Sequence, residues 1–138
     1  MECISSERKM SIEYSNLSVG IATAGPQLLC EVEGILKVRF DDEEFLSEEG
    51  ILLLELAKEL CGWLKKSCNF SYYSMDYEDG PILSFKKVGE FWEVSSIWSE
   101  HVYNGVNLFT IISEVELFIS KLFLDLNMRN IDTSSFIS

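Results

Sequence analysis

The chain has 138 residues, 47% of them hydrophobic and 25% charged, a length that predicts one domain able to bury most of its apolar surface without disulfides or metal. Its formal net charge of −12 repels nucleic acid and anionic lipid and favours encounter with basic proteins or cations. The composition therefore excludes nucleic-acid binding and membrane-surface binding as leading functions, although acidity can also serve solubility alone.

The first two elements are expected to be strands that form a hairpin. The first covers about residues 11–22 and is weakly patterned, and Gly25-Pro26 then breaks the chain. The second runs from Leu28 to Phe40 and alternates apolar with charged residues, the period of a half-buried strand. Its apolar face holds Cys30, Val32, Leu36, Val38 and Phe40. Gly34 falls on this face too, which indicates a bulge or a close approach.

An amphipathic helix is expected to begin at Ser47. The Ser47 hydroxyl can cap free amides, and Glu48 and Glu49 lie favourably against the positive end of a helix. A turn of about 100° per residue gathers an apolar stripe on one side. This stripe consists of Leu52, Leu53, Leu56, Ala57, Leu60, Trp63 and Leu64.

Four consecutive acids stand between the second strand and this helix: Asp41, Asp42, Glu43 and Glu44. They are typical of a solvated loop that leads into a helix start. The alternative is a patch that meets lysine and arginine side chains of a partner. Both interpretations remain open.

Three further strands are expected to form an antiparallel meander. They cover about residues 69–77, 82–88 and 91–99. Asp79-Gly80 and Gly89-Glu90 are favoured two-residue hairpin turns, because Gly and Asp tolerate positive φ. These turns would place Phe85 opposite Ser74 on one side and opposite Val94 on the other.

Strand alternation assigns the side chains of this meander to two faces. The face expected against the helices carries Phe70, Tyr72, Leu83, Phe85, Trp92, Val94 and Trp98. The other face carries Tyr73, Met75, Tyr77, Ile82, Phe91 and Ile97. Tyr and Met supply contact area at modest entropic cost, so this second face suits partner binding. The alternative is that another part of the chain covers it.

The segment between the first two of these strands is acidic, with Asp76, Glu78 and Asp79 within four residues. Calcium binding is rejected, because a calcium loop needs an acid near its end and a hydrophobic run follows here. The acids would instead extend a negative rim begun at residues 41–44.

The last expected element is an amphipathic helix over about residues 107–126. Leu117 and Leu124 fall outside its apolar arc and could form a homodimer patch, or be isolated exposed leucines. The elements together predict a two-layer α+β fold of order ββαβββα, with an antiparallel sheet (a hairpin plus a three-strand meander) packed by two helices. Residues 1–138 form this single domain, with about ten residues at each end expected to be flexible.

Catalytic, metal and cofactor patterns are absent from the sequence. His101 is the only histidine, and no glycine-rich phosphate loop is present. The four cysteines show no CxxC pair or zinc spacing and are expected to be reduced thiols. We therefore expect no enzyme, no cofactor and no metal; a general base at His101 acting with Asp76 is the weaker alternative.

The start of the chain has no apolar leader segment, and no stretch approaches the roughly 20 apolar residues that span a bilayer. A cytoplasmic location is expected.

Three segments carry a family resemblance: Tyr72–Glu78, Pro81–Phe85 and Trp92–Trp98. They resemble the core of a small uncharacterised bacterial family associated with toxin and immunity genes, and the resemblance covers about residues 35–126. Immunity proteins of polymorphic and contact-dependent toxin systems are typically single cytosolic domains, often acidic, that bind a toxin domain and block its active site. The resemblance implies such a role and supplies no functional residues.

The leading expectation is a non-enzymatic protein that binds and neutralises a cognate toxin, a basic nuclease, by electrostatic steering and active-site occlusion. The expected contact residues are Asp41, Asp42, Glu43, Glu44, Tyr73, Met75, Asp76, Tyr77, Glu78 and Asp79. The alternative is a sensor domain that binds a small molecule or peptide in a pocket between sheet and helices. The polar groups of that pocket would be Ser74, Asp76, Ser96 and His101.

Overall fold

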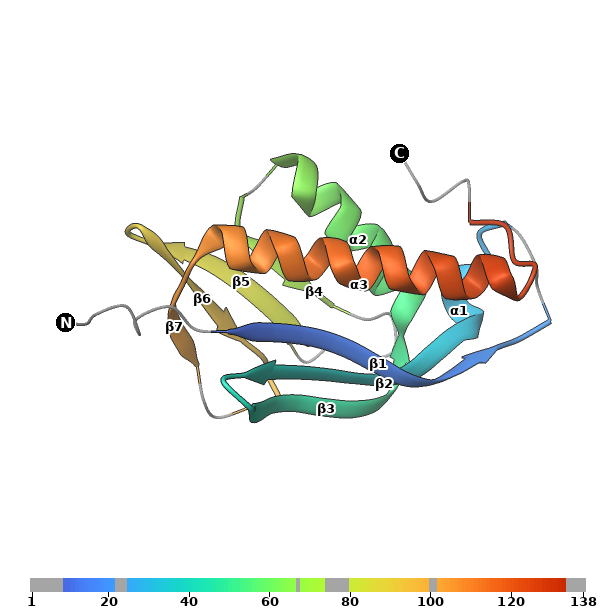
Figure 1. Ribbon diagram of the computed structural model, residues 1–138, viewed down its shortest axis with the longest axis horizontal. Helices are drawn as coiled ribbons and strands as arrows, with labels where there is room; N and C mark the ends of the chain where they lie inside the picture. Colours follow the sequence, from blue (N-terminus) through green and yellow to red (C-terminus); the bar gives the residue numbers. More distant parts are fainter. Residues whose placement is uncertain (1–8, 22–24, 67, 74–79, 100–101, 134–138) are drawn as a thin grey trace.

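The computed structural model describes residues 9–21, 25–66, 68–73, 80–99 and 102–133 (Figure 1). These residues form seven strands and three helices, which confirms the α+β class. The strands divide into two antiparallel sheets, one of three strands and one of four. The element order broadly fits the expected ββαβββα order, to which the structure adds a short first helix and two strands.

The first sheet has the strand order β1-β2-β3. Its strands are β1 (Met10–Val19), β2 (Val32–Phe40) and β3 (Glu43–Leu52). The apolar face predicted for β2 is fully buried at Val32, Leu36, Val38 and Phe40. Cys30 departs from that prediction, because it lies in the short helix α1 (Leu28–Glu31) and is exposed.

Strand β3 begins at Glu43, within the run of four acids, and includes Ser47, so the helix start expected at Ser47 is wrong. Ser47 pairs with Lys37 of β2 instead. The two residues that connect β2 to β3, Asp41 and Asp42, both have positive φ, 51° and 75°, as a two-residue type I′ hairpin turn requires. Pairing with β2 outweighs the local capping signal, and helix α2 (Leu53–Lys66) begins only where the strand ends.

The second sheet has the strand order β4-β5-β6-β7. Its strands are β4 (Phe70–Tyr72), β5 (Leu83–Val88), β6 (Phe91–Ser95) and β7 (Tyr103–Val106). The predicted register of β5 and β6 is confirmed, because Phe85 pairs with Val94 and Lys86 pairs with Glu93. Strand β7 was not predicted, and it pairs with β6.

The register predicted for β4 is wrong, because Phe85 pairs with Phe70 and not with Ser74. The Ile82 N–H donates to the Tyr72 carbonyl at 2.8 Å, so the connection is longer than the expected two-residue turn. The register error is an even number of residues, which leaves the side chains of β4 on their predicted faces. Phe70 and Tyr72 are therefore buried as predicted.

The face predicted to pack against the helices is buried through Phe70, Tyr72, Leu83, Phe85, Trp92 and Val94. Two residues contradict the prediction: Trp98 is 37% exposed, and Ile82 is fully buried. Both lie outside the strands, since β6 ends at Ser95 and β5 begins at Leu83. Strand alternation therefore does not extend to them.

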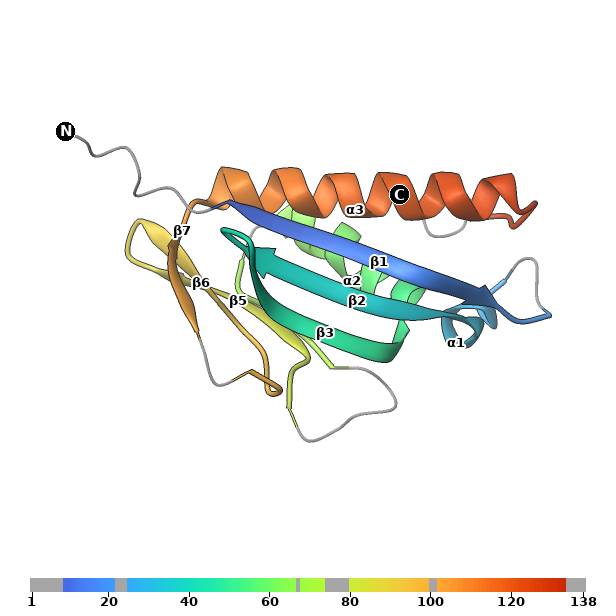
Figure 2. The ribbon, with the colours of Figure 1, turned by 60° about the horizontal axis from the view of Figure 1, so that its bottom comes forward.

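Helix α3 (Leu108–Met128) runs along β1, as Figures 1 and 2 show from two directions. Helix α2 contacts β2, β4 and α3, so it supplies core to both sheets. Among the buried residues of α3 are Ile111, Val115, Leu122 and Leu126. Leu117 and Leu124 lie on its outer side, 63% and 62% exposed.

Candidate functional site

Six acids of the β2–β3 turn and of β3 form what we call the acidic hairpin: Asp41, Asp42, Glu43, Glu44, Glu48 and Glu49. All are exposed except Glu48, which is half-buried. The turn is tied to the start of β1, because the Lys9 N–H donates to Asp41 Oδ1 and the Asp41 N–H donates to the Lys9 carbonyl, both at 2.9 Å. The carboxylates therefore project from a hairpin whose tip is held in place.

Tyr103 of β7 joins this hairpin to the second sheet. Its hydroxyl donates to Glu43 Oε1 at 3.0 Å. Its ring stacks on Phe40, with 4.4 Å between centroids, and meets Phe45 edge-on at 5.5 Å. The aromatic contacts and the hydrogen bond together position one carboxylate of the acidic hairpin.

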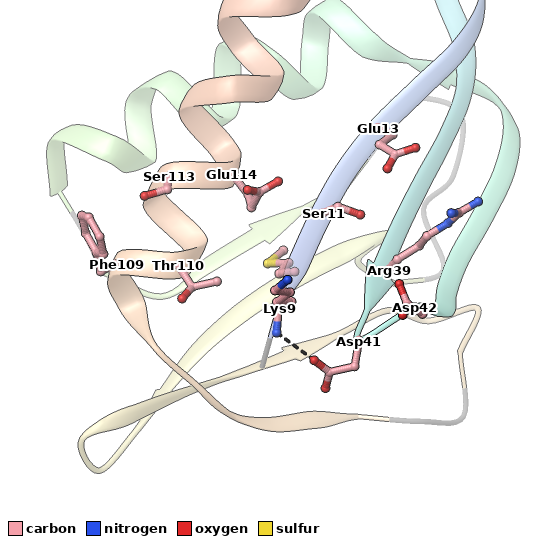
Figure 3. A pocket seen from close by; sticks show the side chains of 11 residues that line it. Lys9, Ser11, Glu13, Arg39, Asp41, Asp42, Phe109, Thr110, Ser113 and Glu114 are labelled. Carbon is pink, nitrogen blue, oxygen red and sulfur yellow. Dashed lines mark hydrogen bonds between the residues drawn. The ribbon is translucent and has the colours of Figure 1, made fainter. Parts of the chain in front are cut away.

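A groove of about 720 Å³ lies between the start of β1, the β2–β3 turn and the first turns of α3. We call it the turn groove. Its lining residues are Lys9, Met10, Ser11, Glu13, Arg39, Asp41, Asp42, Phe109, Thr110, Ser113 and Glu114, most of which Figure 3 labels. Asn107 caps the adjoining helix end, accepting the Phe109 N–H at 2.7 Å, so the α3 side of the groove is a regular, capped helix start.

Glu114 is the half-buried carboxyl of the turn groove. Burial raises its pKa above the ordinary value, and the charge of Glu13 raises it further. Hydrogen bonding to the backbone of Ile12 offsets part of that rise. Removal of water and a like-charged neighbour both disfavour the ionised form, so this carboxylate gains from any cation that enters the groove.

The structure brings part of the predicted contact set to this groove. Asp41 and Asp42 line it, and Glu43 and Glu44 continue along β3. Tyr73, directly after β4, is 56% exposed. The remaining predicted contacts lie outside the described residues: Met75, Asp76, Tyr77, Glu78 and Asp79.

The pocket predicted for the sensor alternative is not the turn groove. Ser96 is buried and accepts a hydrogen bond from the Trp98 N–H at 3.2 Å. Its expected partners Ser74, Asp76 and His101 lie outside the described residues. The same holds for the Asp76 and His101 pair of the enzyme alternative.

Sequence reasoning missed the groove residues Lys9, Glu13, Phe109 and Glu114. Phe109 and Glu114 belong to a helix, and Lys9 and Glu13 to the far end of the chain. A polar position on an amphipathic helix gives no signal about which strand lies beside it. Only the packing of α3 along β1 joins them.

Among the described residues, no three His, Cys, Asp or Glu side chains are arranged to hold a metal ion. No helix in the described segments has the length and apolar character needed to cross a membrane.

Comparison with known proteins adds one finding. The chain matches no curated protein and no solved structure. Residues 9–128 match the family described as a domain of unknown function, DUF7878, which takes in both sheets and all three helices. Since that match covers most of the chain, the protein belongs to the DUF7878 family.

Proposed function

We propose that this protein is an immunity-type protein that binds and neutralises a cognate bacterial toxin, a basic nuclease, in the cytoplasm. The observation that carries the proposal is the acidic hairpin. Its six carboxylates lie on one turn and one edge strand, held by the contacts of Asp41 and Tyr103. The resemblance of the segments Tyr72–Glu78, Pro81–Phe85 and Trp92–Trp98 to the core of an immunity-associated family supports the same role.

Three acids of the hairpin, Glu44, Glu48 and Glu49, offer their charge to a partner. In the described part of the chain, no ion pair joins Glu44, Glu48 or Glu49 to a lysine or arginine. A surface of one sign steers an oppositely charged protein and raises its association rate, most strongly at low salt. The lysines and arginines with which a nuclease holds phosphates would be occupied by these carboxylates, so substrate would be excluded.

Acidic side chains on a sheet edge also prevent edge-to-edge pairing of sheets. Preventing edge-to-edge pairing requires only that the edge be charged, whereas a toxin interface requires carboxylates at particular positions. The two are separated by comparing variants with equal net charge.

Binding to the protein encoded beside this gene tests the proposal. The E44K/E49K variant should associate at least about tenfold more slowly at low salt, with a smaller salt dependence. The matched control is E59K/E116K, which changes net charge equally at exposed positions of α2 and α3. A failure of the wild-type protein to bind or inhibit the neighbouring gene product would contradict the proposal, and so would equal losses in the two variants.

The second candidate is a sensor domain, which the volume and position of the turn groove favour. A groove of about 720 Å³ between sheet and helix lies in the usual size range of ligand sites. Saturable binding of a small ligand in the groove, with no binding or inhibition of the neighbouring gene product, would support this candidate over the toxin inhibitor.

A further inference from the structure

We infer that this protein forms a symmetric dimer in which the outer faces of two copies of α3 pack against each other in antiparallel orientation. The inference does not rest on the proposed function, because it concerns a different surface from the acidic hairpin. We call this surface the outer stripe. It consists of Phe109, Ser113, Leu117, Ser120, Leu124 and Met128.

The four large side chains of the outer stripe are exposed. Leu117 and Leu124 are 63% and 62% exposed, and Phe109 and Met128 are each 75% exposed. At about 100° per residue, the six positions fall within about 100° of arc, on the side of α3 opposite its buried residues. Figure 2 shows this helix at the top of the molecule, with the strands of the first sheet below it. A row of large apolar side chains on one open helix face is typical of an interaction surface.

The outer stripe contains no charged residue, in a chain whose net charge is −12. Of the four charged residues of α3, Glu114, Lys121 and Asp125 contact β1 through its backbone or through Tyr14. The fourth, Glu116, lies on the side toward α2. Depletion of charge combined with Phe and Met is the composition of an interface core. A basic partner would gain nothing from this face that the acidic hairpin does not offer more strongly.

The outer stripe is complementary to itself when one copy is reversed. Its six positions are symmetric about one midpoint, between residues 118 and 119, so reversal sets each stripe position opposite another. The three pairs are Phe109 with Met128, Ser113 with Leu124, and Leu117 with Ser120. Each leucine therefore meets a serine of the other copy, and such alternation of large and small residues lets two helices interdigitate. A two-fold interface requires this reciprocity, so the pattern selects a second copy as the occupant.

Electrostatic repulsion favours the antiparallel orientation over the parallel one. The acidic hairpin lies beside the start of α3, because Asp41 and Asp42 line the same groove as Phe109 and Thr110. A helix of 21 residues is about 30 Å long. Antiparallel pairing therefore places the two acidic hairpins near opposite ends of the dimer, beyond the screening length of about 10 Å. Parallel pairing would bring both hairpins to the same end.

Sedimentation velocity of the full chain tests for the dimer, with chain concentrations from about 2 to about 200 µM at a physiological ionic strength of about 0.15 M. The mass should rise with concentration from the 15.8 kDa of one chain toward twice that value. A mass that stays at 15.8 kDa over the whole range would overturn the inference.

The deciding variant is L117Q/L124Q, which removes apolar surface while glutamine keeps the helix propensity of leucine. Both positions are exposed, so the core of the monomer is untouched. The dissociation constant should rise about tenfold or more. The matched control is V88T/V102T, which removes exposed apolar surface away from α3 and should dimerise as wild type does. Equal dimerisation in L117Q/L124Q and wild type, or equal weakening in the two variants, would overturn the inference.

Photocrosslinking tests the orientation. Met128, an exposed position, is replaced by p-benzoylphenylalanine, and the labelled chain is mixed with ¹⁵N-labelled wild type so that crosslinks between copies can be identified by mass spectrometry. The antiparallel dimer predicts crosslinks to residues around Phe109 of the second copy. Crosslinks to residues around Met128 of the second copy would show parallel pairing and overturn the assignment.

A role of the outer stripe in toxin binding is read separately. If L117Q/L124Q leaves the mass unchanged but weakens binding of the neighbouring gene product, the stripe is a toxin contact and the dimer inference fails. If the protein dimerises through the stripe but does not bind the neighbouring gene product, the inference stands and only the proposed function fails.

Discussion

Tyr14 of β1 donates a 2.7 Å hydrogen bond from its hydroxyl to Oδ2 of Asp125 on α3. Burial raises the pKa of Tyr14, and the Asp125 carboxylate raises it further. The pair links residues far apart in the chain and holds the long helix against the edge strand that lines the turn groove. Its contribution to stability can be measured directly.

Replacing Tyr14 with Phe should lower the free energy of unfolding by about 1–2 kcal/mol, because a hydrogen bond to a charged acceptor is lost while the ring remains. Urea denaturation measures the change. The control is Y73F, at an exposed tyrosine, which should stay within about 0.5 kcal/mol of wild type. An equal effect in both variants would show that the Asp125 bond contributes nothing.

The raised pKa of Tyr14 predicts a pH dependence. In the unfolded chain this tyrosine ionises near its ordinary pKa of 10.0, whereas the folded state retains the proton to higher pH. The unfolded state therefore binds fewer protons above pH 10, and stability falls as pH rises further. The difference in unfolding free energy between wild type and Y14F should shrink above pH 10, and a difference that stayed constant would contradict this.

The raised pKa of Glu114 predicts that stability also falls with rising pH in the acidic range. Its folded pKa lies above the ordinary 4.5, so its contribution to stability is present below pH 4.5 and is lost as pH rises through the folded pKa. Glutamine does not titrate. Relative to wild type, E114Q should gain stability as pH rises from 4 to 7, measured by denaturation at each pH. The prediction would be contradicted if the wild-type protein gained stability relative to E114Q between pH 4 and pH 7.

The hydroxyl and the ring of Tyr103 should have separable effects. Y103F removes the hydroxyl that donates the exposed hydrogen bond to Glu43 and keeps the ring, and it should cost less than about 1 kcal/mol. Y103A also removes the stacking on Phe40 and Phe45 and should cost about 2–4 kcal/mol, as loss of a half-buried aromatic does. Thermal unfolding of both variants measures the difference. Similar losses in the two would mean that the ring contacts contribute little.

Gly34 is a packing requirement, because a Cβ there would lie 2.7 Å from Leu53 Cδ1 and 2.9 Å from the Ser15 carbonyl oxygen. The G34A variant should lose about 1–3 kcal/mol, since the Ser15 backbone cannot move aside easily. Gly62 offers the matched control: nothing lies within 4 Å of its Cβ position in helix α2. The G62A variant should gain up to about 1 kcal/mol.

Elements with strong local patterns were predictable. In β2 every second side chain is buried, and in α3 the buried side chains follow the helical repeat. The spacing of apolar residues in the sequence is therefore enough to identify both elements. The β5–β6 register was predictable too, because Gly89 adopts the positive φ of 66° that its hairpin turn needs. Even the wrong β4 register assigned Phe70 and Tyr72 correctly to the core, since side-chain facing depends only on parity.

What the sequence determined by itself was the class of fold, the buried faces and the excess of negative charge. Tertiary structure decided where that charge lies. Ser47 became part of a strand because β2 pairs with this segment over most of its length, and those hydrogen bonds outweigh one capping interaction. It also brought Glu114 beside β1, where the charge of Glu13 acts on it, since α3 packs along β1. Secondary structure follows from neighbours in the chain, whereas a binding site is formed by segments that meet only after packing.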